Sequence, residues 1–172
     1  MPSLRPTATT ALLGAVLALG TACGNGTYAN ISGSVEGIKI APTAFFYGGP
    51  FIVFTSRESD CIDMAWVKRG SSFESGGEPP TDYDMKSLLF TYANDEVVAE
   101  NVNVEGESLV DARVLVVTGG AMAVYRAESG YIDVTEFSKK DHAIGEFDLG
   151  FENGSLTGDF EVEDCNNLKA DR

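Results

Sequence analysis

The chain has few of the side chains from which enzyme and metal centres are commonly built. Its 172 residues include one histidine, His142, together with three cysteines and one tryptophan. A single imidazole and the lack of a CxxC spacing disfavour a zinc site. The sequence also has no HExxH motif, no G-x-S-x-G nucleophile elbow and no glycine-rich phosphate loop. We therefore expect a protein that is not an enzyme and that needs no cofactor and no metal.

Basic side chains and long apolar runs are also scarce. The chain has 12 lysines and arginines against 26 aspartates and glutamates, which gives a net charge of −14. So negative a surface repels the phosphates of nucleic acids, and this excludes nucleic acid as a partner. The apolar stretch at residues 11–20 has about half of the roughly 20 residues that a membrane-spanning helix needs. An uncleaved transmembrane anchor is therefore not expected.

What the chain does have is an amino-terminal segment with the layout of an export signal. Arg5 lies in a polar start, residues 11–20 are apolar, and the small residues Thr21 and Ala22 precede Cys23. A basic start, a short apolar region and a small-residue cleavage site are typical of secretory signals. With the cysteine directly after the small residues, the segment resembles a bacterial lipoprotein signal, in which cleavage leaves Cys23 as the lipidated amino terminus. The alternative is an ordinary secretory signal that leaves Cys23 as a free thiol.

The lipoprotein interpretation divides the chain into three parts. It predicts a signal peptide at residues 1–22, a lipidated tether at 23–30 and a single β domain at 31–172. Several acyl chains on Cys23, palmitate among them, would hold the protein on a membrane, because one chain alone binds only marginally. Gly24, rather than an aspartate, follows the cysteine. We therefore expect a lipid anchor in a bacterial outer membrane, with the domain on either the periplasmic or the cell-surface face.

The remaining two cysteines predict a disulfide bond. If Cys23 carries the lipid, Cys61 and Cys165 are left in the domain. Exported compartments are oxidising, so a pair of this kind forms a disulfide there. On the loop-entropy model, closing a loop of about 100 residues stabilises the fold by up to about 4.7 kcal/mol. The alternative is two buried, independent thiols.

Short apolar runs separated by turn residues predict an all-β fold. Runs rich in β-branched and aromatic residues lie at 45–47, 51–54, 88–92 and 114–117, and Gly48-Gly49-Pro50 is a turn signal between the first two. No long stretch has a sustained apolar period of 3.6 residues. This pattern is typical of an antiparallel β-sandwich, with a β-barrel as the alternative and little helix outside the signal peptide. Residues 81–87 are the one place where a helical turn fits.

The clearest local prediction is a hairpin near the carboxyl end. Phe147, Leu149 and Phe151 alternate with polar or small residues, and Asn153-Gly154 marks a turn. Phe160 and Val162 continue the alternation on the return strand. Asp159, Glu161 and Glu163 share the opposite face of that strand, and we expect them to be exposed.

The same region carries a wider resemblance. It consists of a Ser129-Gly130 turn before the strand 131–135, the sequence Gly145-Glu146-Phe147, the sequence Gly158-Asp159-Phe160, and a terminal Cys165. The pattern is similar to the carboxyl-terminal half of many uncharacterised predicted bacterial lipoproteins, in which a G-x-F hairpin ends in a cysteine. The resemblance covers residues 129–165. It implies a small, β-sandwich-like envelope lipoprotein and carries over no catalytic residue.

These observations lead to one leading functional hypothesis and two alternatives. The leading hypothesis is a membrane-anchored, non-enzymatic binding or assembly component of the cell envelope, with another envelope protein as its partner. The first alternative is an adhesin-like or calcium-assisted glycan-binding module, because exposed carboxylates such as those of residues 159–163 are the ligands that Ca²⁺ prefers. The second is a small hydrolase with two opposed carboxylates. His142, among charged neighbours, is interpreted as a solvated side chain.

Overall fold

The computed structural model describes residues 27–57, 84–94, 96–104, 108–139 and 141–165. In these ranges the chain forms strands and no helix. The strands are β1 (Tyr28–Val35), β2 (Ala44–Gly48), β3 (Phe51–Thr55), β4 (Asp84–Tyr92), β5 (Asn101–Asn103), β6 (Val110–Thr118), β7 (Ala121–Arg126), β8 (Ser129–Phe137), β9 (His142–Phe151) and β10 (Gly154–Asp164). The predicted all-β class is confirmed. The predicted signal peptide, Cys23 and Cys61 lie outside the described residues.

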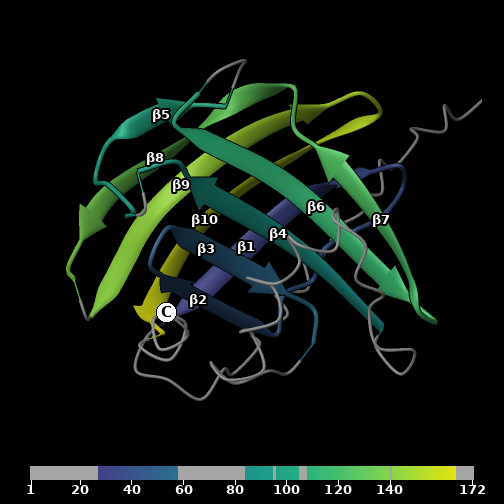
Figure 1. Cartoon of the computed structure of the whole chain (residues 1–172), viewed down its shortest axis with the longest axis horizontal. Coiled ribbons are helices and arrows are strands. Elements are labelled where there is room, and N and C mark those ends of the chain that lie inside the picture. The colour runs from purple at the N-terminus through teal and green to yellow at the C-terminus, as the bar shows by residue number, and fades with distance from the viewer. Residues whose placement is uncertain (1–26, 58–83, 95, 105–107, 140, 166–172) are drawn as a thin grey trace, which may run out of the picture.

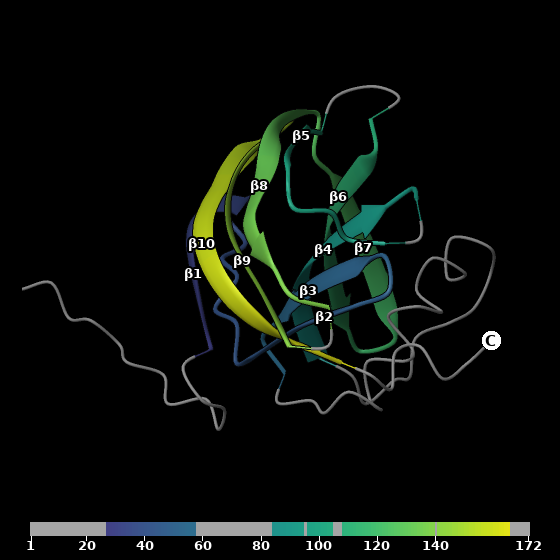
Figure 2. The same cartoon turned by 90° about the vertical axis from the view of Figure 1, so that its left-hand side faces the viewer.

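All ten strands belong to one sheet, which curls into a half-barrel. Their order is β5-β8-β9-β10-β2-β3-β4-β6-β7, and β1 also pairs with β10. Figure 1 shows the strands crossing in two layers, and Figure 2 shows these layers from the side, with β1 and β8–β10 in one and β2–β4, β6 and β7 in the other. The architecture corresponds to the predicted barrel alternative, because one continuous sheet makes both layers of what the sequence suggested as a sandwich.

Strand β10 is the reason that one sheet can make both layers. Residues 154–161 of β10 pair with β1, whereas Glu163 and Asp164 at its end pair with Phe46 and Tyr47 of β2. The partner on this edge therefore changes along β10, and the sheet continues into the second layer. The pairing with β2 is parallel, where the sequence predicted antiparallel strands.

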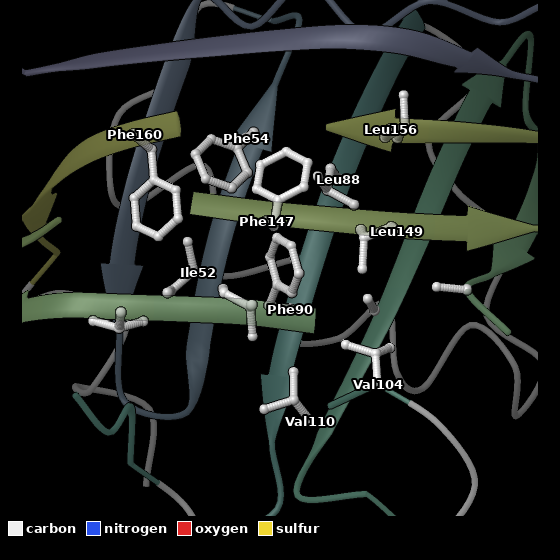
Figure 3. Close-up of a cluster of buried hydrophobic side chains, with 14 of the residues drawn as sticks. Ile52, Phe54, Leu88, Phe90, Val104, Val110, Phe147, Leu149, Leu156 and Phe160 are labelled. Carbon is white, nitrogen blue, oxygen red and sulfur yellow. The ribbon is translucent and has the colours of Figure 1, made fainter. Parts of the chain in front are cut away.

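The core lies between the two layers and is centred on aromatic side chains. Phe54 and Phe90 come from one layer, and Phe147 and Phe160 come from the other. The ring centroids of Phe54 and Phe160, and those of Phe90 and Phe147, are both 5.4 Å apart (Figure 3). Aromatic pairs at such distances stabilise by about 0.5–1.5 kcal/mol beyond the burial of their area. The core thus joins residues that are far apart in the sequence.

The predicted carboxyl-terminal hairpin is confirmed as β9 and β10. Phe151 pairs with Gly154, so the turn consists of Glu152 and Asn153, one position earlier than predicted. Gly154 has a φ of +139°, and a Cβ atom there would lie 2.0 Å from the carbonyl oxygen of Ser34 on β1. Glycine at this position therefore allows β1 to approach the hairpin.

The layer of β2–β4, β6 and β7 has buried apolar side chains on both of its faces. Val53, Leu89, Leu115 and Cys165 form a second buried cluster on the face away from the main core. Strands buried on both faces have continuous rather than alternating apolar sequences, as 51–54 and 88–90 do. Residues 84–87 belong to β4, so the predicted helical turn is wrong over these residues, and residues 81–83 lie outside the described chain.

Candidate functional site

A cavity lies at the corner where the chain passes from β7 to β8. Its volume is about 600 Å³, within the range of typical ligand pockets. It lies between the end of β7, the turn joining β9 to β10, the end of β1 and the start of β6, elements that can be followed in Figure 1. We call it the corner cavity. The described residues that line it are Val35, Glu36, Val104, Ser108, Val110, Asp111, Val124, Tyr125, Arg126, Ala127, Glu128, Phe151, Glu152 and Asn153.

The corner cavity has an apolar floor and a charged rim. Val35, Val110 and Phe151 are buried and extend the main core to the cavity. Glu128 and Glu152 are exposed, as is Glu36 at the end of β1. A hydrophobic floor with a few polar groups at its edge is the usual composition of a binding pocket.

One carboxylate of the cavity is shared between two guanidinium groups. Asp111 Oδ2 lies 2.5 Å from Arg113 Nε, and Asp111 Oδ1 lies 3.2 Å from Arg126 Nε. The side chains of Arg113, Asp111 and Arg126 are 19%, 33% and 61% exposed, respectively. Ion pairs this open to solvent contribute little stability. Their consequence is electrostatic, because the two guanidinium groups more than neutralise Asp111, and the three glutamates still leave the rim with a net negative charge.

Glu36, the rim glutamate that directly follows β1, is held in place by the turn between β9 and β10. Glu36 N donates to Asn153 O at 2.9 Å, and Asn153 Nδ2 donates to Glu36 Oε1 at 2.6 Å. Glu36 has a φ of +51°, a left-handed conformation that is uncommon for residues with a side chain. The two hydrogen bonds hold this conformation and place the Glu36 carboxylate beside the cavity.

The predicted acidic strand face is present and larger than the sequence showed. Asp159 and Glu163 are exposed and Glu161 is half-buried, whereas Phe160 and Val162 face the core, as expected. The register adds a row across three strands, in which Asp133 of β8 is opposite Glu146 of β9, and Glu146 is opposite Asp159. We call these residues with Asp148 the acidic face.

Two local interactions accompany the acidic face. Asn30 Nδ2 donates to Asp159 Oδ2 at 3.0 Å, and Tyr131 Oη donates to Glu146 Oε1 at 3.4 Å. The negative charge of Glu146 raises the pKa of the Tyr131 hydroxyl above its usual value. Within the described ranges, no three histidine, cysteine or acidic side chains are gathered closely enough to hold a metal ion. The described part of the acidic face therefore offers no built calcium site.

His142 lies at the start of β9 between two carboxylates. Its Nε2 is 3.0 Å from Glu136 Oε1, and its Nδ1 is 3.1 Å from Asp141 Oδ2. The hydrogen bond to Glu136 is the largest cause that raises the pKa of His142 above 6.5, and partial burial opposes it. The structure thus brings the one imidazole to a surface ion-pair group rather than to the described lining of the corner cavity.

Cys165 follows β10 and is fully buried in the second cluster. Its backbone N donates to Tyr47 O at 2.7 Å. The predicted partner, Cys61, lies outside the described residues, so the pairing of these two cysteines stays a prediction.

Sequence reasoning missed the residues of the corner cavity. Asp111 and Arg126 lie on neighbouring strands, and Glu36 and Glu152 lie in two turns that are distant in the sequence. None of these positions carries a local motif. Only the pairing of β1 with β10 and of β6 with β7 brings them together.

Comparison of the chain with protein-family models, with curated proteins and with solved structures gives no match in any of the three. The described residues include no helix with the length and hydrophobicity needed to span a membrane.

Proposed function

We propose that this chain is a lipid-anchored, non-enzymatic binding component of a bacterial cell envelope that takes its partner into the corner cavity. The observation that carries the proposal is the cavity itself, with its apolar floor and its rim of Glu36, Glu128 and Glu152. Half of its described lining residues lie on strands, and the backbone of these residues is held in place by the sheet before a partner binds. Preorganisation of this kind lowers the cost of binding.

The chemistry of the described lining supports binding rather than reaction. It contains neither histidine nor cysteine, and its single serine, Ser108, donates its hydroxyl to the carbonyl oxygen of Val110. The Asp111 carboxylate is engaged by Arg113 and Arg126. The described lining therefore offers no serine–histidine or cysteine–histidine pair, the arrangement that activates a hydroxyl or thiol nucleophile.

The proposed location rests on the amino-terminal sequence. Acylation of Cys23 would anchor the domain at the outer membrane through a tether that is shorter than predicted, because residues 28–30 belong to β1. A Cys61–Cys165 disulfide belongs to the same proposal, because exported compartments are oxidising.

Site-specific cross-linking in cells tests the proposal. A photoreactive amino acid replaces Leu109, which is 43% exposed and lies between the cavity residues Ser108 and Val110. The matched control replaces Thr157, which is exposed on the opposite, outer side of β10. We expect a discrete set of envelope proteins from position 109 and not from position 157. Equal products from both positions, or none from position 109, would contradict the proposal.

Anchoring is tested separately with Cys23→Ser. We expect this variant to lose its acyl chains and to move from the membrane fraction to the soluble fraction. Retention of Cys23→Ser in the outer membrane would overturn the proposed anchor but not the proposed binding site.

A further inference from the structure

The edge of β7 is open along its whole length in the described part of the chain. β7 is the last strand in the sheet order and pairs there with β6 alone. Its sequence, AMAVYR, has no proline and no lysine, and its one charge is at the end. Proteins commonly protect exposed edges with such residues, because an open edge is a template for another strand. The edge of β7 has little of this protection.

The hydrogen-bond alternation shows which backbone groups this edge presents. Ala127 N donates to Ala112 O at 2.9 Å, so these residues are a hydrogen-bonded pair. Since such pairs alternate with non-hydrogen-bonded pairs, Tyr125, Ala123 and Ala121 also bond to β6. The N–H and C=O groups of the other three residues of β7 point away from the sheet, and these residues are Met122, Val124 and Arg126.

The turn before β7 gives the same alternation independently. Thr118 pairs with Ala121 across a two-residue turn of Gly119 and Gly120, whose φ values are +59° and +84°. Two positive φ values are characteristic of the type I′ turn, which joins a hydrogen-bonded pair. Counting from Ala121 again leaves the backbone groups of Val124 directed outward.

The corner cavity reaches this open edge. Val124 packs against the second cluster and Tyr125 packs against the main core, as consecutive residues of a strand face opposite sides. Both nevertheless line the corner cavity. The cavity therefore has residues of both faces at the end of β7, beside the open edge. The apolar floor, the charged rim and the outward backbone groups are neighbours on the surface.

We propose that a partner polypeptide adds an extended segment to the edge of β7 and places a basic side chain in the corner cavity. Strand addition of this kind takes its affinity from backbone hydrogen bonds and its specificity from pockets for alternate side chains. Glu36, Glu128 and Glu152 favour a lysine or arginine at the position that enters the cavity. A second copy of this chain is disfavoured as the occupant, because each copy carries a net charge of −14. The inference rests on the proposed binding function and names its partner class.

Two synthetic peptides test this inference on the full exported protein in detergent. Both alternate threonine and valine and are capped at their ends, and they differ only in a central lysine or glutamate. We expect the lysine peptide to bind at least about tenfold more tightly, because a charge-assisted hydrogen bond contributes about 1.5–3 kcal/mol. Glu128→Gln with Glu152→Gln should remove most of this preference.

Amide hydrogen exchange identifies the binding mode. Strand addition predicts that the lysine peptide slows exchange at Met122, Val124 and Arg126 but leaves Ala123 and Tyr125 unchanged, because the latter two are already bonded to β6. Val124→Pro removes one outward donor while leaving the bonds to β6 in place, and should weaken binding about tenfold. Val124→Ala is the matched control, which keeps the donor and should bind within about threefold of the unmodified protein.

The outcomes separate the inference from the function on which it rests. Binding of the lysine peptide without alternate amide protection overturns strand addition and leaves a binding role for the cavity in place. If neither peptide binds, strand addition is overturned, and cross-linking from position 109 alone decides the binding function. Where Val124→Pro fails to fold, the exchange pattern of the unmodified protein decides whether a strand is added.

Discussion

Glu146 on β9 lies directly opposite Asp159 on β10, and both carboxylates face solvent on the outer side of the sheet. Asp133 of β8 extends the row on the other side of Glu146. Like charges opposite one another in a sheet are destabilising. The acidic face therefore lowers the stability of the layer on which it lies.

Relief of this repulsion should be measurable. We expect Glu146→Gln to raise the free energy of unfolding by about 0.5 kcal/mol at low ionic strength. The gain in the free energy of unfolding should be smaller in 1 M salt, where the Debye length is only about 3 Å. Glu163→Gln is the control, because Glu163 lies opposite His142 rather than another acid. Urea denaturation at both ionic strengths measures the effect, and a gain that persists in high salt would argue against charge repulsion.

His142 should make part of the stability depend on pH. Its pKa is raised in the folded state, chiefly by the hydrogen bond to Glu136. Its contribution is therefore fully present below pH 6.5, the ordinary value, and is lost as the pH rises through the raised pKa. We expect the stability difference between the unmodified protein and His142→Gln to decline over that range.

Titration of the His142 ring by NMR gives the control for this prediction. Glu136→Gln should lower the pKa of His142 relative to the unmodified protein, because it removes the main stabilising partner of the imidazolium. An unchanged ring titration in Glu136→Gln would show that the hydrogen bond does not exist in solution.

Two buried tyrosines should respond in opposite ways to loss of the hydroxyl. Tyr92 is 3% exposed, and its hydroxyl has no hydrogen-bond partner among the described residues, whereas Tyr47 Oη donates to Ser138 O at 3.0 Å. A buried hydroxyl without a partner costs about 1–3 kcal/mol. We therefore expect Tyr92→Phe to raise the melting temperature and Tyr47→Phe to lower it. A fall in both variants would mean that Tyr92 has a partner.

The proposed Cys61–Cys165 disulfide should contribute strongly to stability. On the loop-entropy model, its removal costs up to about 4.7 kcal/mol for a loop of about 100 residues. We expect Cys61→Ser and Cys165→Ser, and reduction of the unmodified protein, to lower the melting temperature to a similar extent. Cys23→Ser should leave it unchanged. An unchanged melting temperature on reduction would contradict a stabilising disulfide between Cys61 and Cys165.

The sequence predicted those parts of the fold that a local pattern encodes. The β9–β10 hairpin follows from strict alternation around the Asn153-Gly154 signal, and the exposure of Asp159 follows from the burial of Phe160. The continuous run 51–54 forms β3, as its β-branched and aromatic residues indicated. In each case, the physical cause lies within a few residues of the effect.

The half-barrel and the corner cavity have no such local cause. The curl of the sheet depends on β10 pairing with both β1 and β2, and no residue of β10 marks that change of partner. Glu36 meets Asn153, and Asp111 meets Arg126, only after the strands have paired. The candidate site therefore depends on which strands pair and in which register, and a single sequence does not show this.

The pairing of β1 with β10 also governs when the domain can fold. Tyr28, in the first strand, is paired with Glu161, in the last, so the sheet closes across almost the whole length of the domain. Contacts so distant in sequence form slowly, because the entropy of a long loop must be overcome before they stabilise anything. A chain that emerges amino end first thus has no partner for β1 until its last strand has appeared. In the exported protein that we propose, β1 would therefore stay unpaired while the chain is transported, and passage through a narrow channel requires strands that have not yet paired.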